Sequence, residues 1–185
     1  MALPRHGAYS KNLPIEPWYS RLERFRLVLH CGFTGPGEVL VAVSSISQMI
    51  TLLVPTMNRS DFLIRLLCYY RDLEFQGCIY VGDSSQEFHA TRTKRAINAF
   101  DRQLHIVYCK YPDRNNAECI RDLLALVSTP YAVLLADDDF LVPDSMEQCV
   151  MFLESHPEYS AAHGVAVLFH LESSGAHGPL KWVDR

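Results

Sequence analysis

The sequence predicts an α/β fold in which helices cover both faces of a mostly parallel sheet. Short apolar segments alternate with segments of helical period from residue 50 to residue 153, which is the order of successive β-α units. Residues 131–135 are apolar throughout, as in a central parallel strand buried on both faces. Because such sheets bind ligands beyond the carboxyl ends of their strands, functional side chains are expected in the loops there.

The first β-α unit has clear boundaries. A β-branched strand over residues 50–54 ends at Pro55, and Ser60 with Asp61 is expected to cap the next helix. The apolar positions of that helix follow the 3.6-residue period: Phe62, Leu63, Leu66, Leu67 and Tyr70. The elements expected next are strands over 78–81, 104–109 and 131–135, a polar helix over 86–100 and a helix carrying Cys119, Ile120, Leu123, Leu124 and Val127.

The last helix and strand follow the Asp-rich segment. Asp144 and Glu147 resemble a capping box, and the helix that they begin has an apolar face of Met146, Cys149, Val150 and Leu153. Residues 161–170 are expected to form a fifth strand.

Two parts of the chain differ in pattern. Residues 1–47 follow no clean period and contain several proline and glycine breaks, so they are expected to form an irregular N-terminal extension. Deleting them should leave the melting temperature nearly unchanged. Residues 48–185 are expected to form the α/β domain.

Composition restricts the class of partner and the location. The formal net charge is -4, and the basic residues form no broad cluster, so no nucleic-acid-binding face is expected. No apolar stretch is long enough for a transmembrane segment. The six cysteines lie far apart and form no Cys-x-x-Cys pair, which favours reduced thiols in a cytoplasmic protein.

The loop after the first strand contains three candidate ligand contacts. Thr56 and Asn58 could contact the base or ribose of a nucleotide, and Arg59 could contact phosphate. Alternatively, Pro55 only ends the strand, while Asn58 serves as a turn residue.

The next two loops add weaker candidates. Asp83 follows the second strand and could accept hydrogen bonds from a nucleotide, or it could form only an Asx turn. The third loop contains Asp113, Arg114, Asn115 and Asn116; Asp113 or Asn115 is slightly more typical of a helix cap than of a ligand contact.

The strongest candidate is the triplet Asp137, Asp138 and Asp139. Three adjacent carboxylates repel each other unless a cation neutralises them, and oxygen ligands suit Mn²⁺ or Mg²⁺. In an extended segment Asp137 and Asp139 project to one side and Asp138 points away. We expect the carboxyl ends of the strands to gather Thr56, Asp83 and Asp139 into one cleft.

Several enzyme classes lack their motifs here. There is no Gly-x-Gly-x-x-Gly after a strand, no P-loop and no Gly-x-Ser-x-Gly elbow, which argues against dinucleotide oxidoreductases, P-loop NTPases and α/β-hydrolases. His163, His170 and His177 are spaced too widely for a chelate on one element.

Three motifs together resemble family 2 glycosyltransferases, which adopt the Rossmann-like GT-A fold. Residues 50–59 resemble the opening strand and loop of that family, and residues 80–85 resemble its second acidic motif. Residues 134–140 resemble its metal-binding Asp-x-Asp region, although Ala136 stands where an aspartate is common. The resemblance covers about residues 49–170, with the motifs in the family's order.

The resemblance implies a metal-dependent transfer of a sugar from a UDP- or GDP-linked donor to an acceptor hydroxyl on a glycan, lipid or protein, with inversion. The residues it implies for donor binding are Pro55, Thr56, Asn58, Arg59, Asp83, Asn116, Asp137 and Asp138, with Mn²⁺ or Mg²⁺ on Asp137 and Asp139. The family's catalytic base lies well downstream of the metal motif, and the chain ends at Arg185. The chain is therefore expected to be the donor-binding half, truncated at its C-terminus, with the catalytic residue unknown.

Two alternative functions fit the same residues. The chain could bind nucleotide and metal without catalysis, as an incomplete form of such an enzyme. A phosphatase of the haloacid-dehalogenase kind also places Asp-x-Asp after a strand, but there the motif follows the first strand, whereas here it follows the fourth.

Overall fold

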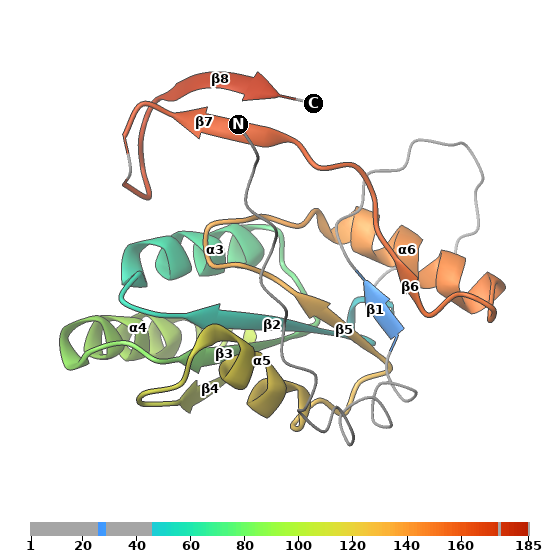
Figure 1. Cartoon of the computed structure of the whole chain (residues 1–185), viewed down its shortest axis with the longest axis horizontal. Helices are drawn as coiled ribbons and strands as arrows, with labels where there is room; N and C mark the ends of the chain where they lie inside the picture. Colours follow the sequence, from blue (N-terminus) through green and yellow to red (C-terminus); the bar gives the residue numbers. More distant parts are fainter. Residues whose placement is uncertain (1–25, 29–45, 174, 185) are drawn as a thin grey trace, which may run out of the picture.

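Strands and helices alternate along the computed structural model, which describes residues 26–28, 46–173 and 175–184 (Figure 1). The elements in chain order are β1 (Arg26–Val28), β2 (Ile50–Thr56), α3 (Ser60–Asp72), β3 (Cys78–Asp83), α4 (Glu87–Phe100), β4 (His105–Lys110), α5 (Asn116–Leu124), β5 (Tyr131–Leu134), α6 (Pro143–Ser155), β6 (Ala161–Ala162), β7 (Leu168–Leu171) and β8 (Leu180–Asp184). The predicted α/β class is confirmed.

The main sheet has the strand order β4-β3-β2-β5-β1-β6, and each neighbouring pair is parallel. The register places Thr56 beside Asp83 and Asp83 beside Lys110, so the carboxyl ends of β2, β3 and β4 lie level. The predicted placement of Thr56 and Asp83 at one edge of the sheet is therefore confirmed. We call this edge the carboxyl edge.

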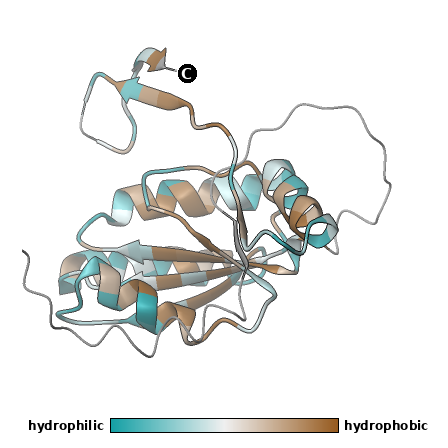
Figure 2. Ribbon diagram, turned by 45° about the vertical axis from the view of Figure 1, so that its right-hand side comes forward, coloured by the Kyte–Doolittle hydropathy of each residue, from teal (hydrophilic) through white to brown (hydrophobic). Residues whose placement is uncertain are grey.

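Two apolar clusters cover the two faces of the sheet. Leu52 and Val54 of β2 belong to the larger cluster, which includes residues of α3, α4 and α6. Leu53, between them, belongs to the smaller cluster, which α5 covers. This alternation follows from the period of two in a strand. Figure 2 shows the apolar strands between the helices, and Figure 1 shows α3 and α6 on the side opposite α5.

The predicted helix starts differ from those observed. The cap position of α3 is Arg59, so Ser60 is already the first residue of the helix and does not cap it; its hydroxyl pairs with Nδ1 of His89 at 2.9 Å. Pro143 begins α6, and the Glu147 carboxylate accepts a hydrogen bond from the Ser47 hydroxyl instead of completing a capping box. The apolar face predicted for α6 is buried.

Two expectations about the ends of the domain are corrected. Arg26–Val28, inside the segment predicted to be irregular, form β1 between β5 and β6; most of residues 1–47 lie outside the described residues. Residues 161–170 are not one strand, because β6 joins the main sheet while β7 pairs antiparallel with β8. The local apolar pattern predicts extended backbone but not its pairing partner.

The expectation of reduced cysteines is confirmed for Cys68, Cys78, Cys109 and Cys119. It is wrong for Cys149, which is disulfide-bonded. Sequence spacing alone does not show which cysteines meet in space.

Candidate functional site

A cavity of about 250 Å³ lies at the carboxyl edge, where the chain leaves β2 and β5. β2 and β5 are neighbours in the sheet. The next main-sheet strand along the chain after β2 is β3, on the side of β2 away from β5, whereas the next one after β5 is β6, on the opposite side of the sheet. Open α/β sheets bind ligands at such a reversal of strand order. The residues that line the cavity are Pro55, Thr56, Met57, Arg59, Ser84, Arg114, Asn116, Cys119, Ala136, Asp137 and Asp138.

The loop after β2 is held against the loop after β3. Asn58 has a φ of 57°, a left-handed conformation that asparagine tolerates better than most residues. Its backbone N–H donates to Ser85 Oγ at 2.7 Å, and its Oδ1 accepts from the N–H of Gln86 at 2.8 Å. Asn58 thus serves as a turn residue joining two loops, and it does not line the cavity.

The loop after β5 is a turn that brings two carboxylates to Arg59. The strand ends at Leu134, and the N–H of Asp139 donates to the carbonyl of Ala136 at 3.2 Å. Arg59 Nη2 donates to Asp138 Oδ2 at 2.7 Å, and its Nε lies 3.3 Å from Asp137 Oδ1. The expectation that Asp138 points away is wrong, because the alternation of an extended strand does not apply in a turn.

Asp137 is the buried member of the triplet, with 5% of its surface exposed. Its Oδ2 accepts a 2.7 Å hydrogen bond from Thr56 Oγ1, across the two central strands. Burial raises the pKa of Asp137, although the Thr56 hydrogen bond and the charge of Arg59 act in the opposite direction.

Arg59 is the cationic partner of this turn. Burial lowers the pKa of Arg59, but the hydrogen bond to Asp138 and the charges of the three aspartates outweigh burial and raise it. The guanidinium therefore remains charged next to the carboxylates.

Arg65 connects the same turn to the β7–β8 hairpin. Its Nη2 donates to the carbonyl of Asp138 at 3.0 Å, and its Nη1 donates to the carbonyl of Ala176 at 2.7 Å. The guanidinium also lies over the ring of Phe140, 4.9 Å from its centroid. The β7–β8 hairpin thus contacts the same arginine that supports the backbone of the acidic turn.

Asp83 lies at the carboxyl edge but is fully buried. Its Oδ1 accepts from the N–H of Ser85 at 2.7 Å, and its Oδ2 accepts from the hydroxyl of Tyr108 at 2.7 Å. Both carboxylate oxygens thus contact the chain itself, and the contact with Ser85 is the Asx turn that was one of the two expected roles of Asp83. The cavity is lined by Thr56 and Asp137 but by neither Asp83 nor Asp139. The expected cleft of Thr56, Asp83 and Asp139 is therefore wrong in two of its three residues.

The loop before α5 places two of its four candidate residues, Arg114 and Asn116, at the cavity. Asn115 caps α5 in a capping box with Glu118, as its cap role predicted, and Asn116 lines the cavity. Arg114 also lines it, while its Nε lies 3.3 Å from Asp122 Oδ2. Arg114 comes just before a helix at the carboxyl edge, where cationic side chains and N–H groups favour anions. This position in the sequence is the pattern that points to Arg114 as a ligand contact.

The side chains present do not match the expected divalent cation. No group of three or more His, Cys, Asp or Glu side chains within the described ranges is placed to hold a metal. The Asp137 carboxylate already contacts Thr56 and Arg59, and Asp138 contacts Arg59. Mn²⁺ or Mg²⁺ on Asp137 and Asp139 stays a prediction from the sequence.

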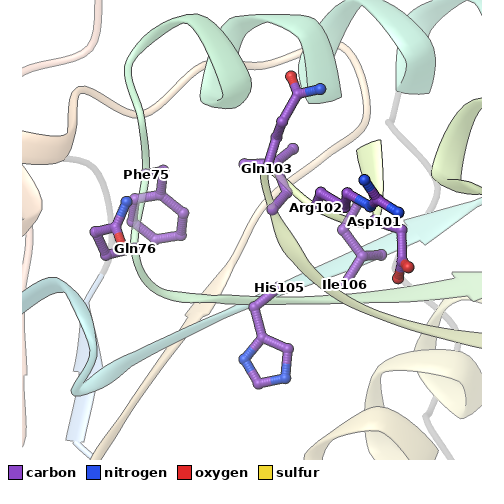
Figure 3. A pocket seen from close by; sticks show the side chains of 8 residues that line it. Phe75, Gln76, Asp101, Arg102, Gln103, His105 and Ile106 are labelled. Carbon is purple, nitrogen blue, oxygen red and sulfur yellow. The ribbon is translucent and has the colours of Figure 1, made fainter. Parts of the chain in front are cut away.

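A second cavity, of about 300 Å³, lies between the loops that enter β3 and β4 (Figure 3). It is lined by Phe75, Gln76, Asp101, Arg102, Gln103, Leu104, His105 and Ile106. These loops lie at the amino ends of the parallel strands, at the edge opposite the predicted site residues. None of those predicted residues lines it.

Comparisons with known proteins add no relative: no protein-family model and no curated protein matches this chain. In the part of the chain that the structure describes, none of the helices has the length and apolar character needed to cross a membrane.

Proposed function

We propose that this chain binds a nucleotide-diphosphate sugar, UDP- or GDP-linked, as a family 2-like glycosyltransferase of the GT-A fold. The observation that carries the proposal is the cavity at the reversal of strand order. Six of the eight residues predicted for donor binding line it: Pro55, Thr56, Arg59, Asn116, Asp137 and Asp138.

The cavity offers different chemistry on its two sides. Pro55 and Thr56 at the end of β2 present a wall against which a nucleoside can lie. Arg114 and the N-terminus of α5, together with Arg59, offer positive charge and N–H donors to a diphosphate. Sugar transfer to an acceptor hydroxyl releases a nucleoside diphosphate, and these groups would stabilise its charge.

The proposal is tested by calorimetric titration of the full chain with UDP and GDP, with uridine as the control that lacks phosphate. We expect one of the two diphosphates to bind and uridine to bind much more weakly, because the arginines recognise charge. Arg114→Gln should weaken diphosphate binding at least about tenfold, as loss of a charge-assisted hydrogen bond does.

Arg121→Gln is the matched control for this variant. Arg121 and Arg114 both form ion pairs with Asp122, but Arg121 does not line the cavity. Equal weakening by the two variants, or no binding of either diphosphate, would contradict the proposed site. Binding without turnover of UDP- or GDP-sugars would identify a catalytically incomplete nucleotide-binding protein.

A further inference from the structure

Arg59 is located where a cation at the acidic turn would have to bind. Its guanidinium contacts Asp138 Oδ2 at 2.7 Å and Asp137 Oδ1 at 3.3 Å, so it joins two of the three adjacent carboxylates. The same arginine lines the cavity, with 40% of its side chain exposed. It can therefore contact the acidic turn and a ligand at the same time, since a guanidinium has five N–H donors.

The position of Arg59 is set by the start of α3. Its carbonyl accepts from the N–H groups of Phe62 and Leu63 at 3.0 and 3.2 Å, which fixes its backbone against the first turn of the helix. Its guanidinium lies over the Phe62 ring, 4.3 Å from the centroid. A planar, stacked guanidinium is well suited to a bidentate role between carboxylates and phosphate.

A divalent cation on the same carboxylates would compete with this guanidinium. Two like charges within a few ångströms repel, strongly so at a partly buried site. We propose that Arg59 takes the place of the divalent cation, joining Asp137 and Asp138 to the donor diphosphate, so that donor binding needs no metal. The diphosphate part of this inference rests on the proposed function, while the counter-ion part does not.

The first experiment measures Mn²⁺ binding to the full chain by electron paramagnetic resonance, with no nucleotide present. We expect no saturable binding to the wild type. Arg59→Gln should bind Mn²⁺ at least about tenfold more tightly, because the carboxylates lose their cationic partner. Asp138→Asn in the Arg59→Gln background should remove that gain.

Two further variants separate charge from folding. Arg59→Lys keeps the positive charge and should not gain Mn²⁺ binding. Arg92→Gln removes an arginine that pairs with Asp61, away from the cavity, and should behave as the wild type. Thermal melting of each variant checks that it is folded.

The second experiment measures binding of UDP and GDP in Mn²⁺ and in chelator. We expect equal affinity of the wild type in both conditions. Arg59→Gln should bind at least about tenfold more weakly in chelator, as loss of a charged hydrogen bond predicts, and should recover when Mn²⁺ is added. Metal dependence would then appear only when the arginine is removed.

Either of two results would overturn the inference: wild-type binding of Mn²⁺ as tight as that of Arg59→Gln, or wild-type nucleotide binding that requires Mn²⁺. The second of these would instead support the cation that the sequence predicts. If neither diphosphate binds in any condition, the proposed function fails, and the Mn²⁺ titration still decides whether Arg59 is the counter-ion.

Discussion

At the scale of single residues, Asp137 combines burial with contacts from distant parts of the chain. Its partners are Thr56, the last residue of β2, and Arg59, in the loop after β2; both precede it by about eighty residues. A carboxylate that is removed from water is costly even when paired, and burial accordingly raises the pKa of Asp137. Residues selected for binding often lower the stability of the folded protein compared with the residue that would stabilise that position most.

The raised pKa of Asp137 makes the stability of the folded chain depend on pH. An aspartate with a raised pKa binds its proton more readily in the folded state, so wild-type stability should increase as pH falls from 7 towards the ordinary value of 3.8. Asp137→Asn avoids burying the charge, so it should raise the free energy of unfolding at pH 7 relative to the wild type. This gain in the free energy of unfolding should be smaller at pH 4 than at pH 7, as measured by urea unfolding at the two pH values.

The control for this comparison is Asp72→Asn, which also removes a negative charge but at an exposed position. If the stability gain of Asp137→Asn over the wild type were larger at pH 4 than at pH 7, folding would not raise the pKa of this carboxyl.

At the scale of elements, the approach of α5 to β3 shapes one wall of the cavity. Gly82 lies where a Cβ would overlap Cys119 Sγ and would come within 3.1 Å of Leu123 Cδ1. The missing side chain lets α5 pack closely on the sheet, which places Asn116 at the cavity. A glycine near the end of a strand thus has a packing role here.

We predict that Gly82→Ala lowers the free energy of unfolding by about 1–3 kcal/mol, because an added methyl forces a well-packed interface apart. Guanidinium chloride unfolding measures the change. Gly175→Ala is the control, since the nearest atom to its Cβ would be Ser173 Oγ at 3.8 Å. Equal effects of the two substitutions would mean that α5 yields to the methyl without cost.

At the scale of the whole molecule, the main sheet includes a strand from the N-terminal segment. Arg26 and Leu27 of β1 pair with Tyr131 and Ala132 of β5, while Leu27 and Val28 pair with β6. Without β1, the backbone groups of β5 and β6 that face it would lose their partners. The N-terminal segment is therefore connected to the strand that leads into the acidic turn.

We predict that deletion of residues 1–45 lowers the melting temperature by about 2–8 °C, since a loss of about one to two kcal/mol has this effect in a chain of this size. This reverses the expectation drawn from the irregular sequence pattern. A shorter deletion, of residues 1–20, keeps β1 and should melt close to the full chain. Identical melting of the two deletions would show that β1 adds no stability.

The sequence by itself determined the features that depend on neighbours along the chain. The order of β-α units, the Asn115 cap and the buried face of α6 follow from periodicity and local hydrogen bonding. The placement of Pro55, Thr56 and Asp137 at the carboxyl edge follows as well, because parallel strands all end at one edge.

Only the tertiary structure decided which of these side chains meet. It pairs Arg59 with Asp138, withdraws Asp83 into a buried hydrogen-bonded turn, and brings Arg114 to the cavity. It also places β1 inside the sheet. Each outcome depends on strand order and on the path of a loop between residues far apart in sequence, and local patterns of polarity do not specify that path.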